Sequence, residues 1–178
     1  MFGGLGSRDH QLKNPGGLSV AGNGDIIVAD SGDKLIKTFS PSWKFLRKFG
    51  GDGTLVSPVH CIQTEQYLIV SDCGDHCIKA FDLQGNFKFK FGKKGNEEGE
   101  FNKTGYLSVS KSGHLVVCDR GNHRLQVFEL SGKFVTMFGT EGSETGEFKW
   151  PVSTANLSDG RIVVSDHRNN RIQILELI

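Results

Sequence analysis

The stretch VVCDRGNHRLQVF, residues 116–128, gathers side chains that could do chemistry. Asp119 ends an apolar run, and the polar residues that follow it are Arg120, Asn122, His123 and Arg124. A carboxylate beside an imidazole can transfer protons, and both groups are metal ligands. The same residue types also build tight turns, because an aspartate side chain accepts backbone N–H groups. The rest of the chain distinguishes a catalytic cluster from a structural turn.

Versions of this stretch recur along the chain with a period of about 45 residues. The aspartates of the four versions are Asp30, Asp72, Asp119 and Asp166. A Phe-Gly pair recurs with them, at Phe2, Phe49, Phe91 and Phe138. A catalytic aspartate would be unique, whereas a turn residue is expected in every repeat. We therefore predict four structural turn residues and no catalytic residue.

Each repeat has the pattern of four short strands. In the third repeat these are residues 107–110, 114–119, 125–129 and 133–138. The second is an almost unbroken apolar run, typical of a strand buried on both faces, and the fourth alternates as a half-exposed edge strand does. No helical period is present. The pattern predicts an all-β protein, a β-propeller of four-stranded antiparallel blades with one repeat per blade.

The repeats set the expected domain organisation, a single propeller over residues 1–178. The units span about residues 2–49, 50–91, 92–138 and 139–178. The last unit ends after its third strand, so we expect its blade to lack an outer strand. This indicates part of a larger ring, with an open flank that is prone to association.

The segments DRGNHRLQVF and DHRNNRIQIL, with Phe-Gly and GEF nearby, resemble NHL repeats. Residues 91–128 look most like the repeats at the C-terminus of animal tripartite-motif proteins. That resemblance implies a six-bladed propeller, with a RING, B-boxes and an oligomerising coiled coil ahead of it. The sequence MFGG at the start does not resemble a signal peptide, so we also expect a cytoplasmic location. No RING sequence is present in this chain, so the resemblance implies a non-catalytic scaffold, with any ubiquitin-ligase activity residing in the RING.

The resemblance also implies two kinds of partner, bound by the loops on one face of the propeller. One is single-stranded or stem-loop RNA, bound in post-transcriptional regulation, and the other is a protein substrate recruited for ubiquitination. Basic loop residues would neutralise phosphates, and an aromatic such as Trp150 would stack on a base or instead wedge between blades. The candidate binding residues are Lys93, Lys94, Lys103, Arg120, His123, Lys149, Trp150, His167 and Arg168.

Composition argues against some functions. Lys plus Arg number 21 against 20 Asp plus Glu, which gives a net charge of +1 and no global electrostatic case for RNA. No apolar run has the length of a membrane span, so no membrane partner is expected. The segment CGDHC, residues 73–77, has zinc-like spacing but no second ligand pair nearby. We favour a structural role for its cysteines and predict no metal and no cofactor.

One alternative comes from other NHL propellers. Some are metalloenzymes like the lyase of peptide amidation, and others bind ligands outside the cell. His60 is the candidate for such chemistry, but it has no repeated counterpart in the chain.

Overall fold

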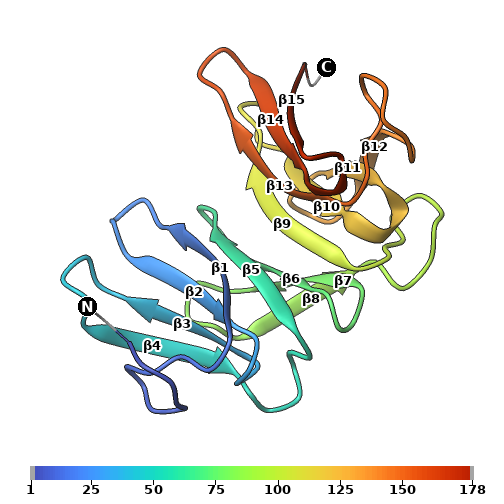
Figure 1. Ribbon diagram of the computed structural model, residues 1–178. Helices are drawn as coiled ribbons and strands as arrows, with labels where there is room; N and C mark the ends of the chain where they lie inside the picture. The colour runs from blue at the N-terminus through green and yellow to red at the C-terminus, as the bar shows by residue number, and fades with distance from the viewer. Residues whose placement is uncertain (1–2, 177–178) are drawn as a thin grey trace. The chain divides into compact units, whose positions relative to one another are not determined.

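The computed structural model describes residues 3–176, and Phe2 of the first Phe-Gly pair lies outside that range. The described residues form short strands and two single-turn 3-10 helices. The chain divides into two compact units, Met1–Lys90 and Phe91–Ile178. Each unit contains two antiparallel sheets, here called blades, whose strands follow one another in chain order (Figure 1). No helix in the described part of the chain is long and apolar enough to cross a membrane.

Unit 1 holds blades 1 and 2. Blade 1 consists of β1 (Pro15–Val20), β2 (Ile26–Asp30), β3 (Leu35–Phe39) and β4 (Phe45–Gly50). Blade 2 consists of β5 (Pro58–Gln63), β6 (Leu68–Asp72), β7 (Cys77–Phe81) and β8 (Phe87–Phe91). The second and third strands of blade 2 are buried along their whole length. An almost unbroken apolar run predicts this for the second strand, whereas the third strand also buries Lys79.

Unit 2 holds blades 3 and 4. Blade 3 consists of β9 (Thr104–Val109), β10 (Leu115–Asp119), β11 (Arg124–Phe128) and β12 (Phe134–Phe138). Blade 4 consists of β13 (Pro151–Asn156), β14 (Arg161–Asp166) and β15 (Arg171–Glu176). The 3-10 helices η1 (Arg120–Asn122) and η2 (His167–Asn169) join the second and third strands of these two blades.

The structure differs from the sequence-based expectation at two places in blade 3. The first strand, β9, begins at Thr104, three residues earlier than expected, because a register shift lets Thr104 pair with Asp119. The turn after Asp119 is a 3-10 helix, where the sequence showed no helical pattern. His123 ends it in the left-handed conformation, at φ 57°, and donates its backbone N–H to the carbonyl of Arg120.

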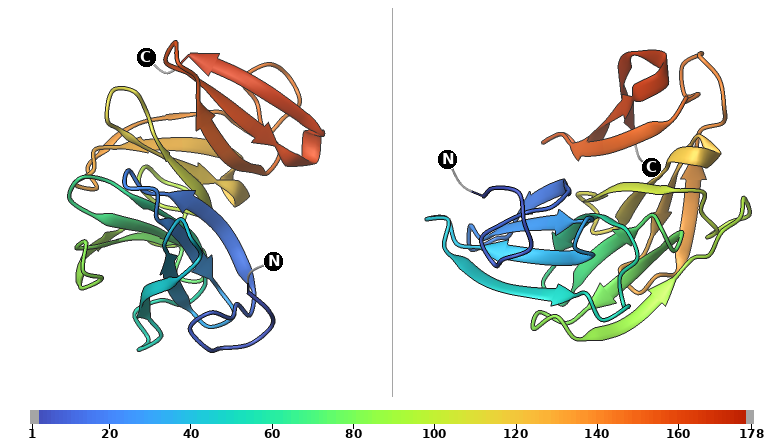
Figure 2. Two further views of the ribbon diagram at one scale, coloured as in Figure 1. Left: turned by 90° about the vertical axis from the view of Figure 1, so that its left-hand side faces the viewer. Right: turned by 60° about the horizontal axis from the view of Figure 1, so that its bottom comes forward.

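The hydrophobic core of each unit lies between its two blades. In unit 1, Ile27 and Ile36 of blade 1 cluster with Cys61 and Val70 of blade 2. In unit 2, side chains of blade 3 cluster in the same way with Ile162 and Val164 of blade 4. The first strands of successive blades consequently lie side by side, β1 beside β5 and β9 beside β13 (Figure 2). This packing fixes the ends of the strands, where the loops begin.

Candidate recognition surface

The repeated aspartates anchor the loop that precedes their blade. Asp72 accepts the backbone N–H groups of Val56 and Ser57, both at 2.8 Å, from the loop that leads into β5. Its own turn supplies only the N–H of Gly74, at 3.2 Å. The corresponding donors are Lys13 and Asn14 for Asp30, Asn102 for Asp119 and Lys149 for Asp166. The aspartates have a structural role, and the donors come mainly from the connecting loop instead of the following turn.

A cation faces each buried aspartate, and the two units supply it differently. In unit 1 the cation is a lysine seven residues later, and Lys37 Nζ lies 2.9 Å from Asp30 Oδ2. In unit 2 it is an arginine five residues later, and Arg124 Nε lies 2.9 Å from Asp119 Oδ2. A glutamine, Gln126, then occupies the lysine position and also donates to Asp119. The replacement of a lysine by an arginine and a glutamine is visible in the sequence. Only the contacts in the structure show that both sets of side chains bind the repeated aspartate.

The balance between burial and hydrogen bonding sets the ionisation of these aspartates. Burial raises the pKa of Asp72, but hydrogen bonds from Lys79 and from two backbone N–H groups outweigh it and hold the pKa below its usual value. The same balance holds the pKa of Asp166 low. For Asp119, burial prevails over the bonds from Asn102, Asn122 and Arg124, and its pKa is raised.

The arginines of unit 2 extend the anchor into the connecting loops. Arg124 donates to the carbonyl oxygens of Asn96 at 2.8 Å, Glu97 at 2.8 Å and Glu100 at 2.9 Å. Arg171 holds the equivalent loop of blade 4, through carbonyls that include that of Glu147 at 2.8 Å. These loops carry most of the candidate binding residues. The hydrogen bonds from Arg124 and Arg171 therefore fix the loop backbone that positions those residues.

Three cations converge on the indole ring of Trp150, which is half-buried at the start of blade 4. The ring centroid lies 4.4 Å from Arg168 Cζ, 5.6 Å from Lys103 Nζ and 5.9 Å from Arg120 Cζ. Each of these distances is within the range of a cation–π interaction. Arg168 and Lys103 are exposed, so the cluster offers positive charge to the solvent beside an aromatic surface.

The backbone at this cluster is strained. Trp150 and Lys103 have φ values of 62° and 60°, in the left-handed region that a bulky side chain rarely adopts. In this conformation the backbone N–H of Trp150 donates to Nδ1 of His123, at 3.2 Å. The other ring nitrogen of His123, Nε2, lies 4.0 Å from Oε1 of Glu141. Strain of this kind is concentrated at functional sites, where surrounding contacts hold it in place.

Other sequence-predicted residues lie apart from this cluster. Lys93 pairs with Glu100 at 3.1 Å, and Lys149 Nζ donates to Ser143 Oγ at 3.3 Å. Lys94 lines a hollow of about 170 Å³ beside η1, and His167 lines a separate one of about 510 Å³ beside η2. Of the nine candidates, the structure assembles Lys103, Arg120, His123, Trp150 and Arg168, here called the Trp150 cluster.

The three buried cysteines, Cys61, Cys77 and Cys118, lack the features of a reactive thiol. Burial raises the pKa of Cys77 to about 11 and that of Cys118 to about 12. Residues 3–176 contain no group of three or more His, Cys, Asp and Glu side chains placed to hold a metal ion. His60 is buried, its ring Nε2 lies 3.2 Å from the carbonyl oxygen of Leu18, and burial lowers its pKa.

Comparison with known proteins identifies the repeats and the fold. The family model of the NHL repeat matches residues 107–128 and 148–175, so the chain contains NHL repeats in blades 3 and 4. A search of curated proteins gives no match.

Solved structures with the same fold are distant in sequence. Virginiamycin B lyase from Staphylococcus aureus aligns over 94% of this chain and 58% of its own, at 10% identity and a TM-score of 0.69. An auxiliary nutrient binding protein from Bacteroides thetaiotaomicron aligns over 94% of this chain and 49% of its own, at 13% identity and a TM-score of 0.69. The chain thus spans about half the length of these relatives. Such identities show the fold alone, an all-β propeller with four-stranded antiparallel blades.

Proposed function

We propose that this protein is a non-catalytic recognition scaffold that binds single-stranded RNA through the Trp150 cluster. The observation that carries the proposal is the convergence of Arg168, Lys103 and Arg120 on one indole ring. RNA presents phosphates and unstacked bases together, and proteins bind it with basic side chains beside aromatic ones. The near-neutral chain supplies no general attraction, so the binding must be local to this cluster.

The geometry suggests a role for each side chain. Arg168 is exposed and lies nearest to the ring, where its guanidinium provides both a charge for a phosphate and a plane for a base. Lys103 supplies a second charge. Arg120 donates to the carbonyl of Thr104 at 3.2 Å and is therefore partly committed to the loop. Arg168 and Trp150 are the residues on which binding should depend most.

The test is fluorescence anisotropy with a labelled random single-stranded RNA pool, repeated over a salt series. Three phosphate contacts predict a log–log salt slope of roughly −2 for a single strand. Arg168→Glu should weaken binding by at least about tenfold and make the slope shallower, and Trp150→Ala should weaken binding with little change of slope.

The matched control is Lys111→Glu, which makes the same change of charge. Lys111 lies in the turn between β9 and β10, at the opposite end of the blade from η1. This variant should bind like the original protein. Equal losses for Lys111→Glu and Arg168→Glu, or no RNA binding at low salt, would contradict the proposal.

A second candidate is recruitment of a protein partner by the same loops. The feature that favours it is the acidic side of the surface, where Glu141 approaches His123 and Glu97 and Glu98 lie in the clamped loop. A protein partner predicts a weak salt dependence and a larger loss from Trp150→Ala than from Arg168→Glu.

The finer expectations from the sequence stay predictions. They are a complete ring of six blades, a tripartite-motif protein with ligase modules outside this chain, and a cytoplasmic location. The lyases among the structural neighbours share the fold at 10–13% identity, which does not carry their activity to this chain.

A further inference from the structure

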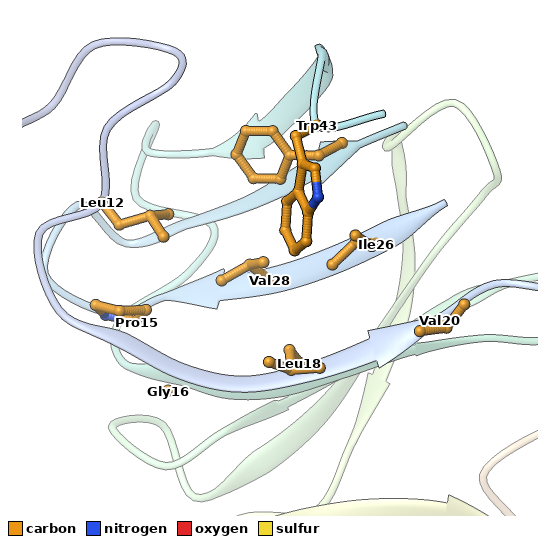
Figure 3. Close-up of a pocket in the computed structure, with 9 residues that line it drawn as sticks. Leu12, Pro15, Gly16, Leu18, Val20, Ile26, Val28 and Trp43 are labelled. Atoms are coloured by element: carbon orange, nitrogen blue, oxygen red, sulfur yellow. The ribbon is translucent and has the colours of Figure 1, made fainter. Parts of the chain in front are cut away.

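Two hollows in the described residues differ in what lines them. A groove of about 760 Å³ on blade 1 is lined by apolar side chains, among them Leu18, Val28 and Trp43 (Figure 3). A smaller hollow of about 170 Å³ lies beside η1 in blade 3. Its lining is polar and consists of Lys94, Gly95, Asn96, Asn102 and Asn122. Three side-chain amides thus share one small space, here called the asparagine hollow.

The asparagine hollow adjoins the Trp150 cluster along the chain. Asn102 immediately precedes Lys103, whose Nζ lies 5.6 Å from the ring centroid of Trp150. Asn122 immediately precedes His123, whose Nδ1 accepts the backbone N–H of Trp150 at 3.2 Å. Consecutive Cα atoms are only about 3.8 Å apart, so an RNA strand bound at the cluster would pass within reach of the hollow.

The side-chain oxygen of Asn122 is an unused acceptor in this hollow. Nδ2 of Asn122 donates to the carbonyl oxygen of Gly95 and to Oδ2 of Asp119, both at 2.8 Å. These two bonds use both hydrogens of the amide group and therefore fix its orientation. Within residues 3–176, no group donates to Oδ1 of Asn122, which leaves this oxygen available to a ligand.

Blade 4 satisfies the equivalent oxygen with its own side chains. Asn169 occupies the position of Asn122 and donates in the same way to Asp166, at 2.8 Å. Oδ1 of Asn169 accepts a hydrogen bond from Ser143 Oγ at 3.3 Å. Lys149 Nζ donates to the same hydroxyl, also at 3.3 Å. A serine and a lysine of the chain thus occupy this place in blade 4.

Blade 1 has the same arrangement around a carboxylate. Ser7 Oγ donates to Oδ1 of Asp33 at 2.7 Å, and Lys13 Nζ lies 3.9 Å from that oxygen. Both blades therefore supply a hydroxyl and an ammonium group at the position that blade 3 leaves open.

Blade 3 has lost both of these donors. Asn96 stands at the serine position and Asn102 at the lysine position, where its backbone N–H binds Asp119 as that of the lysine binds its own aspartate. The side chain of Asn102 donates instead to the carbonyl oxygen of Gly121, at 3.4 Å. Because asparagine is shorter than lysine, space remains where the lysine side chain lies in blade 4.

We propose that the asparagine hollow binds the amino group of a nucleobase, so that the protein prefers a base with such a group, such as cytosine, to uracil. This inference rests on the RNA binding proposed above. The amino group of cytosine donates hydrogen bonds, whereas uracil presents a carbonyl oxygen at the same position. Oδ1 of Asn122 accepts the amino hydrogen, and Lys94 or the free amide of Asn96 donates to the neighbouring ring nitrogen. Phosphate contacts alone cannot make this distinction.

The test compares an RNA octamer of cytidylate with one of uridylate, by fluorescence anisotropy at one salt concentration. The two octamers carry the same charge, so their phosphate contacts contribute equally and the base edge makes the difference. The original protein should bind the cytidylate octamer roughly three- to tenfold more tightly, the effect of a single hydrogen bond.

The double variant Asn96→Ser/Asn102→Lys closes the hollow by restoring the pair of side chains found in blade 4. It should bind both octamers equally, because the serine satisfies Asn122 and the lysine fills the space. Its added charge acts on both octamers alike, so the ratio of the two dissociation constants is the quantity compared. Ser158→Lys is the control, since it adds the same charge in the exposed turn between β13 and β14 and should keep the preference. Circular dichroism verifies that the variants are folded.

The outcomes separate this inference from the proposed function. Equal binding of the two octamers by the original protein, or a preference that persists in the double variant, would overturn the inference and leave RNA binding in place. Absence of binding to either octamer would contradict RNA binding itself. NMR with the free nucleosides then tests the hollow alone, because cytidine and not uridine should shift the side-chain amide signals of Asn122. No shift with cytidine, or the same shift in the double variant, would overturn the inference.

Discussion

The Nζ atom of Lys37 lies 2.9 Å from Oδ2 of Asp30, with both side chains fully buried. The amine also donates to the carbonyl of Gln11 at 2.6 Å, so a single lysine ties β3 to the turn and to the loop before β1. In unit 2 an arginine and a glutamine share this task. A buried carboxylate in each repeat is therefore matched by one of two different sets of donors.

Removal of Lys37 should be strongly destabilising. Lys37→Gln leaves Asp30 buried without a cation, and we expect a loss of about 3 kcal/mol in the free energy of unfolding, measured with urea. Lys48→Gln is the control, because Lys48 pairs with Asp9 at the surface and should change little. Equal stability of the two variants would contradict the argument.

The donor set of unit 2 should be transferable to unit 1. Leu35 occupies the position of Arg124, since it pairs with Asp30 as Arg124 pairs with Asp119. Adding Leu35→Arg to Lys37→Gln should regain more than half of the lost stability in the same urea measurement. If the double variant is no more stable than Lys37→Gln alone, the two donor sets are not equivalent.

Acid should weaken unit 1 through Asp72. The pKa of Asp72 is lowered from 3.8 in the folded protein, because the hydrogen bonds from Lys79, Val56 and Ser57 outweigh the effect of burial. Its stabilising contribution is therefore complete above about pH 4 and is lost as the pH falls through the folded value. Asp72→Asn should be less stable at pH 7 and lose less stability between about pH 5 and pH 2. A parallel pH profile for both proteins would contradict this prediction.

Gly17 is required for the approach of β1 to β5. A Cβ at this position would lie 2.9 Å from the carbonyl oxygen of Val59 and would also overlap the ring of His60. Gly17→Ala should lower the free energy of unfolding by about 1–3 kcal/mol in a urea titration. Gly22→Ala is the matched control, because nothing lies within 4 Å of its Cβ.

The thiols should differ in reactivity. Cys61, Cys77 and Cys118 are buried, which raises the pKa of each thiol, and Cys73 is half-buried in the turn after β6. A thiol reagent at pH 8 should modify one cysteine in the folded protein and all four in urea. Cys73→Ser should abolish the reaction of the folded protein, and a reaction that persists would show that a buried thiol is accessible.

Much of the fold was predictable because it depends on local pattern. The run Leu115-Val116-Val117 predicted a fully buried strand, and β10 is one. An aspartate recurs in all four repeats at the position of Asp119, and this recurrence predicted a structural residue. The alternation of apolar and polar residues along a strand indicates which of its faces is buried. Strand burial and the repeated turns can therefore be predicted without knowing which other strands lie nearby.

The contacts of the candidate site were not predictable in this way. Asp72 takes its backbone donors from Val56 and Ser57, about 16 residues away, and only the folded sheet brings that loop to it. Lys93 and Lys103 were both candidate binding residues from the sequence, yet Lys93 pairs with Glu100 and Lys103 reaches the ring of Trp150. The sequence by itself determined the strands and the repeated turns, through hydrophobic pattern. Only the tertiary structure decided which charges are neutralised and which gather at Trp150, because the energy of a charge depends on the groups that packing places around it.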